Sequence, residues 1–118
     1  MAAKDTLGRL GEEVAARFLA DAGLEIVDRN WRCRAGEIDI VAREGDELVF
    51  VEVKTRSGVG YGHPFEAITP RKLARLRRLA AEWCTAHPAT AATLRIDAVA
   101  VIAPIGRVPV VEHLRRVF

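Results

Sequence analysis

The sequence lacks the features that place a protein in or across a membrane. None of its 118 residues belongs to an apolar run as long as the roughly 18 residues that a membrane span needs. Charged residues interrupt the N-terminal segment from Lys4 onward, so it has no apolar core of the kind found in signal peptides. Internal repeats, low-complexity segments and linkers are also missing. We therefore expect one domain, residues 1–118, located in the cytoplasm and without a membrane partner.

Cysteine and histidine are scarce and scattered. Cys33 and Cys84 are far apart, and the histidines His63, His87 and His113 do not stand at metal-ligand spacing from them. This spacing argues against a zinc site. A buried or half-buried free thiol in a reducing compartment is the simpler interpretation.

An excess of charge of one sign is also absent, because 16 acidic residues nearly balance 18 basic ones and the net charge is only +2. The basic residues are almost all arginine. The planar arginine side chain suits phosphate recognition, but a genome biased towards arginine codons would give the same composition. The positions of these residues are therefore more informative than their number.

The spacing of apolar residues predicts two helices. Residues 5–22 carry apolar residues at three- and four-residue steps, which is typical of an amphipathic helix. Asp5 or Thr6 is expected to cap its start, and Gly23 to end it. A second helix is expected over residues 70–88, because a Thr-Pro pair precedes a similar apolar pattern.

Extended segments alternate with these helices. Residues 94–103 are dense in Ile, Val and Ala, which predicts a strand buried on both faces, and residues 109–114 predict an edge strand. Residues 24–27 suit a short strand or an extended connection, and residues 56–66 are a glycine- and proline-rich loop. The order of helix, strands, helix and strands predicts an α/β fold with a mixed central sheet flanked by helices.

The most informative segments are residues 37–42 and 48–55, which are rich in β-branched residues and predict an antiparallel hairpin. A polar segment separates them, with Gly45-Asp46 as the expected two-residue turn. Such a turn pairs Glu44 with Glu47, so the numbers of paired residues sum to 91.

This register brings four charged residues together. Asp39 is expected directly opposite Glu52, and Glu37 opposite Lys54. Because side chains alternate between the two faces of a strand, all four project from the same side. The opposite side then carries only apolar residues, namely Ile38, Ile40, Ala42, Val49, Val51 and Val53.

Directly opposed carboxylates destabilise a strand pair. At ~5 Å they repel by about 3 kcal/mol at an effective dielectric near ~20, whereas a favourable cross-strand pair contributes about 0.2–1 kcal/mol. A divalent cation between Asp39 and Glu52 would offset this repulsion more fully than Lys54 alone, and oxygen ligands suit Mg²⁺ or Mn²⁺. The alternative is a solvated sheet edge with an ordinary salt bridge, but the flanking residues are too apolar for such an edge.

An acidic residue followed by Glu-x-Lys on the next strand resembles the signature of the PD-(D/E)XK nuclease superfamily. The chain also resembles the YraN family of small bacterial proteins along nearly its whole length. The residues that carry the resemblance are Gly8-Arg9-Leu10-Gly11-Glu12, Asn30-Trp31-Arg32-Cys33-Arg34, Gly36-Glu37-Ile38-Asp39-Ile40, Val49-Phe50-Val51-Glu52-Val53-Lys54-Thr55-Arg56 and Pro70-Arg71-Lys72. The resemblance implies a restriction-endonuclease-like core, similar to that of archaeal Holliday-junction resolvases. Ile38 replaces the proline of the superfamily's name, at a position that varies.

The resemblance further implies a Mg²⁺- or Mn²⁺-dependent endonuclease. Asp39, Glu52 and Glu12 would bind the metal, and Glu37 would join them or instead form a salt bridge with Lys54. The alternative for Glu12 is an acid favoured by the dipole near a helix start. The metal would bind a phosphodiester oxygen and lower the pKa of a water molecule. Lys54 would orient that water or stabilise charge on the phosphorus.

Basic residues are expected to bind the substrate. Arg34, Arg56, Arg71, Lys72 and Arg75 could follow a phosphate backbone, although a basic helix face can also be merely solvated. The expected substrate is nucleic acid, with branched or damaged DNA as the first hypothesis; the sequence does not distinguish DNA from RNA or duplex from branched substrates. The alternatives are a non-catalytic nucleic-acid-binding module and a partner-dependent subunit; the opposed carboxylates favour the enzyme, because binding alone does not need them. A homodimer is compatible with the sequence, but no feature fixes it.

Four further residues carry less specific signals. Asp97 interrupts the apolar run of residues 94–103. It could be a distant helper of the site, but we favour a strand-end residue that is hydrogen-bonded to neighbouring backbone. His63, in the glycine-rich loop, could take part in acid–base chemistry or simply be exposed. Trp31 and Trp83 suit the core or a groove wall, with base stacking as the weaker alternative.

Overall fold

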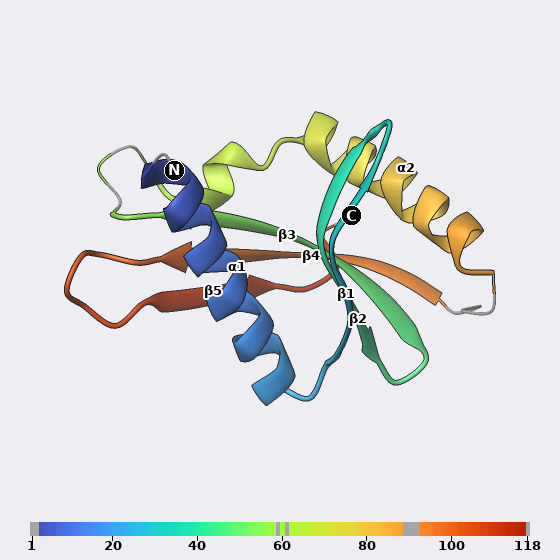
Figure 1. Ribbon diagram of the computed structural model, residues 1–118, viewed down its shortest axis with the longest axis horizontal. Helices are drawn as coiled ribbons and strands as arrows, with labels where there is room; N and C mark the ends of the chain where they lie inside the picture. The colour runs from blue at the N-terminus through green and yellow to red at the C-terminus, as the bar shows by residue number, and fades with distance from the viewer. Residues whose placement is uncertain (1–2, 59, 61, 89–92, 118) are drawn as a thin grey trace.

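A computed structural model of the chain describes residues 3–58, 60, 62–88 and 93–117 (Figure 1). Its elements are α1 (Ala3–Asp21), β1 (Glu25–Cys33), β2 (Gly36–Glu44), β3 (Glu47–Arg56), the 3-10 helix η1 (Pro64–Ala67), α2 (Pro70–Ala86), β4 (Thr93–Ile102) and β5 (Val110–Leu114). Among the described residues, no helix combines the length and apolar character needed to cross a membrane.

The five described strands form one mixed sheet in the order β1-β2-β3-β4-β5. β3 and β4 run parallel, and the other neighbours run antiparallel. A parallel pair needs a long crossover, and α2 lies within the connection between β3 and β4. The two helices pack on opposite faces of the sheet (Figure 1). This arrangement confirms the predicted fold class and is consistent with a restriction-endonuclease-like core.

The β2–β3 hairpin has the predicted register over five residue pairs, from Glu44↔Glu47 to Ile40↔Val51. Its two-residue turn contains Gly45 at φ 59°, a left-handed conformation that glycine adopts without steric cost. Beyond Ile40 the pairing stops. The residues expected to form the site lie in this unpaired part.

Each face of the sheet has its own apolar core. On the α1 face, α1 packs against β2, β3 and β4 through Ala15, Ala16, Leu19, Ile40, Ala42, Val49, Val51, Val53, Val99 and Val101. On the α2 face, the buried residues are Ile38, Val41, Leu48, Phe50, Leu76, Leu79, Ala80, Trp83 and Ile96. Ile38 was expected beside Ile40 and instead belongs to the α2 face, so this part of the predicted pattern is wrong.

The two tryptophans belong to the α2-side core, as expected. Trp83 is buried, its ring meets Phe50 edge to face at 5.7 Å, and its Nε1 donates a 2.9 Å hydrogen bond to Oδ2 of Asp28. Trp31 is half-buried against the same core. The indole N–H of a buried tryptophan needs such a partner, so Asp28 joins β1 to α2.

The helix ends agree with the sequence pattern at three of four positions. Gly23 ends α1 with φ 100°, α2 ends at Ala86 near Pro88, and Thr69 caps α2 by accepting a hydrogen bond from the Lys72 amide at 3.2 Å. The start of α1 was predicted wrongly. The helix begins at Ala3, so Asp5 and Thr6 lie inside it rather than at its cap.

The sequence predicted β1 too short: the strand runs to Cys33 instead of ending at residue 27. It is an edge strand with exposed polar positions, and such a strand lacks the continuous apolar run of a central one. β4 and β5 fall within one residue of the predicted 94–103 and 109–114. Cys33 and Cys84 are free and half-buried, as predicted.

Candidate active site

Three carboxylates gather where β2 and β3 separate. Glu12 comes from α1, and Glu37 and Asp39 come from β2. Each offers one oxygen such that the three atoms lie within 4.8 Å of one another, and all three residues are half-buried. Like charges this close repel unless protons or a cation neutralise them. The cluster therefore has the composition and spacing of a site that could hold a metal ion.

Close packing of α1 on β3 positions Glu12. A Cβ atom added to Gly11 would lie 1.8 Å from Oγ1 and 2.7 Å from Cβ of Thr55. Only a residue without a side chain allows the helix to approach the strand this closely. Gly11, in the middle of a helix where glycine is otherwise unfavourable, thus sets the depth at which the next residue enters the site.

Asn30 on β1 supports Glu12 from the other side. It adopts a left-handed backbone conformation, with φ 52°, which asparagine tolerates better than most residues. The β1–β2 ladder pairs Arg29 with Ile40 and skips Asn30, which would otherwise stand opposite Asp39. Its side chain is hydrogen-bonded to Glu12. The strand irregularity therefore places an amide group against the acidic cluster.

Asp39 does not pair directly with Glu52 as the register predicted. Its Oδ2 accepts a 2.8 Å hydrogen bond from the backbone N–H of Val53, and the β2–β3 ladder ends one residue earlier. The side chain thus takes the place of the backbone acceptor that a continued ladder would have supplied. The predicted pairing of Glu37 with Lys54 is absent for the same reason, and Glu37 forms its ion pair with Arg32 on β1.

The electrostatics show that Glu52 is nevertheless a neighbour of Asp39. Burial and then the charge of Glu52 raise the pKa of Asp39 to about 8, although the Val53 amide lowers it in part. Burial raises the pKa of Glu52, against the cations of Lys54, Arg75 and Lys72. Negative charge is therefore in excess here, although Glu52 lies outside the group of three.

Burial also raises the pKa of Glu12, and the neighbouring Glu37 raises it further. A group at the start of an exposed helix would show no such desolvation. The alternative interpretation of Glu12 as an ordinary helix-start acid does not account for this burial or for its place in the cluster.

A groove leads from the cluster along the end of β3. It has a volume of about 420 Å³ and is lined by Glu12 and Gly8 of α1, by Val53 to Arg56 of β3 and by Ser57. Lys54 and Arg56 thus share one groove with a carboxylate of the cluster. An anionic group entering it would meet two cations.

Comparison with known proteins identifies the family. The family model described as "Uncharacterised protein family UPF0102" matches residues 11–101. The chain belongs to the UPF0102 family. It is 59% identical over 117 residues to a UPF0102 protein of Beutenbergia cavernae, with 99% of each chain covered. It is 58% identical to one of Arthrobacter sp., again with 99% of each chain covered. A Streptomyces griseus relative is 55% identical over 118 residues, with the same coverage. This membership agrees with the YraN-like motifs of the sequence.

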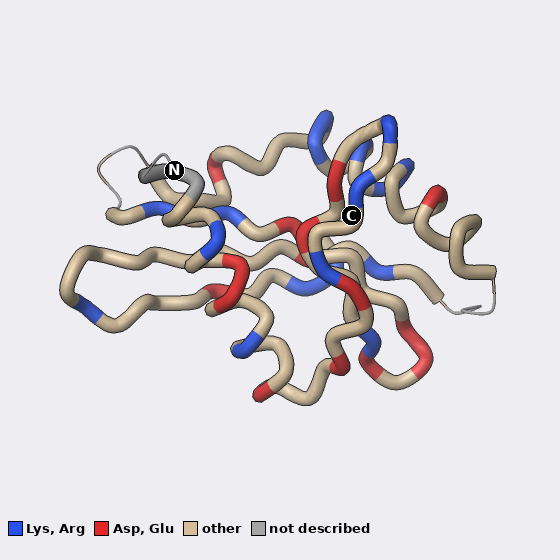
Figure 2. Tube along the Cα trace, in the orientation of Figure 1, with Lys and Arg blue, Asp and Glu red and all other residues tan. Residues whose placement is uncertain are grey.

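The basic residues expected to bind substrate lie in three places in this UPF0102 protein. Arg71, Lys72 and Arg75 are exposed on the first turns of α2, and Figure 2 shows that Lys and Arg recur along this helix. Lys72 and Arg75 are close enough to Glu52 to lower its pKa. Arg56 is half-buried in the groove, and Arg34 is exposed in the β1–β2 turn. The start of α2 is thus joined electrostatically to the acidic cluster.

His63 has a local structural role in this family member. Its Nδ1 accepts a hydrogen bond from the Phe65 amide at 3.1 Å, which caps η1, and its Nε2 lies 3.0 Å from a carboxylate oxygen of Glu112. It therefore joins the loop before α2 to β5. The cap accounts for a histidine at this position without acid–base chemistry.

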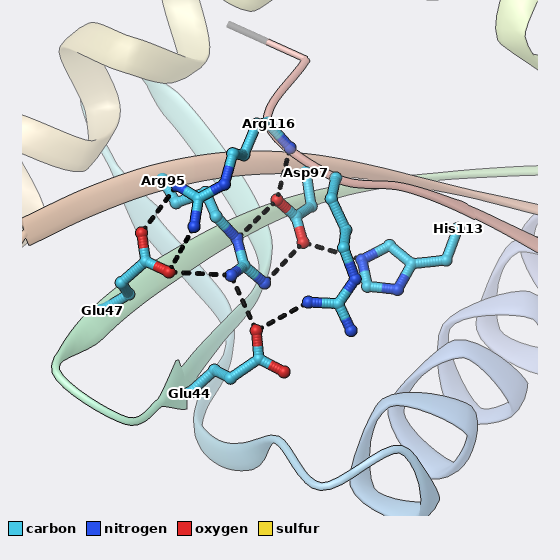
Figure 3. Close-up of polar contacts among 7 residues, drawn as sticks. Glu44, Glu47, Arg95, Asp97, His113 and Arg116 are labelled. Atoms are coloured by element: carbon cyan, nitrogen blue, oxygen red, sulfur yellow. Dashed lines mark hydrogen bonds and ion pairs between the residues drawn. The ribbon is translucent and has the colours of Figure 1, made fainter.

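Asp97 lies in a buried ion-pair network that the sequence did not suggest. It is fully buried in the middle of β4, not at a strand end (Figure 3). Its Oδ1 accepts hydrogen bonds from Nε of Arg95 at 2.9 Å and from the Arg116 amide at 3.0 Å, and its Oδ2 lies 2.7 Å from Nε2 of His113. The network is built on the first half of β4, whereas the acidic cluster lies by the second half of β3. Asp97 is therefore not a helper of the candidate site.

Proposed function

We propose that this UPF0102 protein is a metal-dependent endonuclease that hydrolyses phosphodiester bonds of DNA. The observation that carries the proposal is the half-buried cluster of Glu12, Glu37 and Asp39 beside a groove that contains Lys54. Burying carboxylates near one another destabilises the folded protein. Packing of the apolar core therefore does not explain the cluster. A module that only binds nucleic acid gains nothing from such a cluster, whereas phosphodiester hydrolysis uses it to hold a cation.

The donor set fits a hard cation. The three side chains offer carboxylate oxygens within 4.8 Å of one another, and oxygen-only donors suit Mg²⁺ or Mn²⁺. Glu12, Glu37 and Asp39 would hold the ion, with Glu52 as the neighbouring carboxylate. When bound, the cation supplies Lewis acidity at the phosphodiester and a more acidic water molecule.

Lys54 and Glu52 provide the chemistry of the protein itself. The two are close enough for the Lys54 ammonium group to lower the pKa of Glu52. Lys54 also lines the groove, where its charge would stabilise the negative charge that develops on the phosphoryl oxygens. Glu52 would keep that ammonium group directed towards the site.

Further cations extend the binding surface for the substrate. Arg71, Lys72 and Arg75 on α2, together with Arg56 in the groove and Arg34 in the β1–β2 turn, would contact backbone phosphates on either side of the cleaved bond. Contacts of this kind supply affinity without reading sequence. They favour a substrate recognised by its structure over one recognised by its bases.

The test incubates purified protein with labelled duplex, branched, flapped and single-stranded DNA, and with matching RNA, in Mg²⁺ or Mn²⁺. Asp39→Asn, Lys54→Ala and Glu12→Gln are expected to lower the cleavage rate by about 100-fold or more. Glu13→Gln is the matched control, because Glu13 follows Glu12 but is exposed and paired with Arg29. Calorimetric titration with Mn²⁺ should give one heat of binding that Asp39→Asn abolishes and Glu13→Gln retains.

Two outcomes would overturn the proposal. Cleavage that survives both Asp39→Asn and Lys54→Ala would come from a contaminating enzyme. DNA binding without cleavage in either metal would favour the alternative of a non-catalytic binding module, or of a subunit that requires a partner.

A further inference from the structure

An apolar pocket adjoins the proposed active-site groove. Its volume is about 580 Å³, within the usual range of small-ligand sites. Thr6, Leu7 and Leu10 of α1 form one wall, and the β4–β5 loop from Ala103 to Pro109 forms the other. In Figure 1 this loop projects beyond the sheet on the same side as the start of α1.

The pocket and the groove are neighbours that share part of their lining. Leu7 and Ser57 line both of them. Lys54 and Arg56 line the groove, and Arg107 is part of the pocket wall formed by the β4–β5 loop. Among the described lining residues of the two cavities, Glu12 in the groove is the one acidic residue. An apolar space thus lies between cationic groups, which is the charge pattern of a site for an apolar group that carries phosphates on both sides.

We propose that this pocket receives an unpaired nucleobase from the DNA strand whose phosphate occupies the groove. The proposal rests on the nuclease function and names its substrate class, namely DNA with an unpaired nucleotide next to the cleaved bond. Enzymes that take a base out of the helix surround it with apolar or aromatic side chains. Here Leu10, Pro104 and Ile105 would cover the base, and Thr6 and Ser57 are polar residues of the same lining.

A paired base would not reach the pocket, because stacking holds it inside the duplex. A bulge, flap or branch point already contains an unstacked nucleotide, so the energetic cost of extrusion is smallest there. The pocket would therefore give preference for irregular DNA without any sequence-specific contact. An apolar protein segment could fill the same space, but it would not bring phosphates to Lys54, Arg56 and Arg107.

The experiment measures binding, so that it does not depend on cleavage. Short duplexes carry one 2-aminopurine, either unpaired in a bulge or paired with thymine, and Ca²⁺ replaces Mg²⁺. Wild type is expected to bind the bulged duplex more tightly and to change its 2-aminopurine fluorescence. Ile105→Ser and Leu10→Ser should each lower that preference about 4- to 15-fold, as expected for the loss of one or two buried methylene groups.

Val108→Ser is the matched control. Val108 lies in the same loop and is 85% exposed, but it is not part of the lining, whereas Ile105 is 97% exposed and lines the pocket. Neither side chain is buried in the free protein, so neither substitution should alter folding. Leu10 is 48% exposed, and its variant is checked by thermal unfolding.

The outcomes separate this proposal from the nuclease function. If bulged and paired duplexes bind equally, or if the Ile105 and Leu10 variants keep the preference, the pocket proposal is overturned even where Asp39→Asn abolishes cleavage. If the preference depends on these residues but no DNA is cut in any metal, the pocket stands and the nuclease function falls. A third outcome is a wild-type dimer that Ile105→Ser dissociates while the preference for bulged DNA is unchanged. That result would overturn the proposal and assign the pocket to self-association.

Discussion

Ile38 and Ile40 are two residues apart on β2, yet they pack in the cores on opposite faces of the sheet. In a regular strand, residues i and i+2 point to the same side. The strand therefore turns at Asp39, which lies between them and bonds the Val53 amide through its side chain. The irregularity of β2 and the position of the Asp39 carboxylate therefore have the same cause. The irregular backbone directs this carboxylate between β2 and β3, where backbone hydrogen bonds would otherwise continue the ladder.

The raised pKa of Asp39 predicts how the stability of the metal-free protein depends on pH. The carboxyl group titrates near 3.8 when unfolded and at about 8 when folded. Between these values the folded state binds the extra proton, so the free energy of unfolding falls as pH rises, by at most about 1.4 kcal/mol per pH unit. Asp39→Asn, which cannot ionise, should lose most of this slope. Chemical denaturation between pH 5 and 9 in EDTA measures it.

The same proton competes with a cation. Mn²⁺ affinity of the wild type is therefore expected to rise with pH up to about 8. A stability slope that is identical in wild type and Asp39→Asn would show that the carboxyl group titrates normally. Glu12 and Glu52, whose pKa values are also raised, account for any slope that remains.

The contact between Gly11 and Thr55 predicts opposite effects of two similar substitutions in α1. Gly11→Ala would place a Cβ atom 1.8 Å from Oγ1 of Thr55, and relief of such overpacking costs about 1–3 kcal/mol. Gly8→Ala meets no atom of the described residues within 4 Å and should stabilise the helix by about 0.5–1 kcal/mol. Thermal unfolding of both variants tests the pair.

The consequence for the site can be separated from stability. If Gly11 sets the depth of Glu12, Gly11→Ala should weaken Mn²⁺ binding at a temperature where the variant is fully folded. Combining it with Thr55→Gly should restore part of the affinity. Equal affinity in both alanine variants would contradict this role of Gly11.

The sequence predicted best what depends on local periodicity. The turn at Gly45 fixed the register of Ile40 to Glu44, because a two-residue loop leaves one pairing. The sequence pattern did not predict where the β2–β3 pairing stops. The end of the pairing depends on the hydrogen bond between the Asp39 side chain and the Val53 amide, and the spacing of apolar residues carries no information about such a bond. β1 was underestimated because an edge strand is not uniformly apolar. Two partners of Asp97, His113 and Arg116, were missed because they lie on β5 and beyond it, and only the folded sheet brings them to β4.

The exposed cations of α2 predict a dependence of DNA affinity on salt. Each phosphate contact that is lost should lower the slope of log K against log salt by about 1 and weaken binding similarly for all sequences. Arg71→Ala and Arg75→Ala are the test substitutions. Arg17→Ala is the control, because Arg17 is exposed on α1, which covers the opposite face. Fluorescence anisotropy over a salt series measures the slope; an equal decrease for Arg17→Ala would show a diffuse charge effect instead of a binding surface.

The buried pair of Arg95 and Asp97 predicts a large asymmetry between single and double substitutions. Arg95 is 3% and Asp97 0% exposed, and two hydrogen bonds of 2.9 and 3.0 Å join them. Burial alone would raise the pKa of Asp97, but hydrogen bonds from His113, Arg95 and the Arg116 amide together lower it. The carboxylate is thus charged in the folded protein, and its stabilising effect should be lost only as pH falls through this lowered pKa.

Asp97→Ala would leave the guanidinium group of Arg95 paired with Glu44 and Glu47 beside the β2–β3 turn, but without its buried partner. Removing one member of a buried pair typically costs about 3–5 kcal/mol, enough to lower the midpoint of thermal unfolding by more than ten degrees. The double change Arg95→Met with Asp97→Leu removes both charges and should cost much less, since apolar residues can replace a buried pair. Glu13→Ala, which breaks the exposed pair with Arg29, should cost about 0–1 kcal/mol.

A double variant as unstable as Asp97→Ala would mean that the bonds to His113 and Arg116, and not the charge of Arg95, make Asp97 necessary. Cleavage activity should follow the folded fraction in every variant, because the network lies away from the acidic cluster.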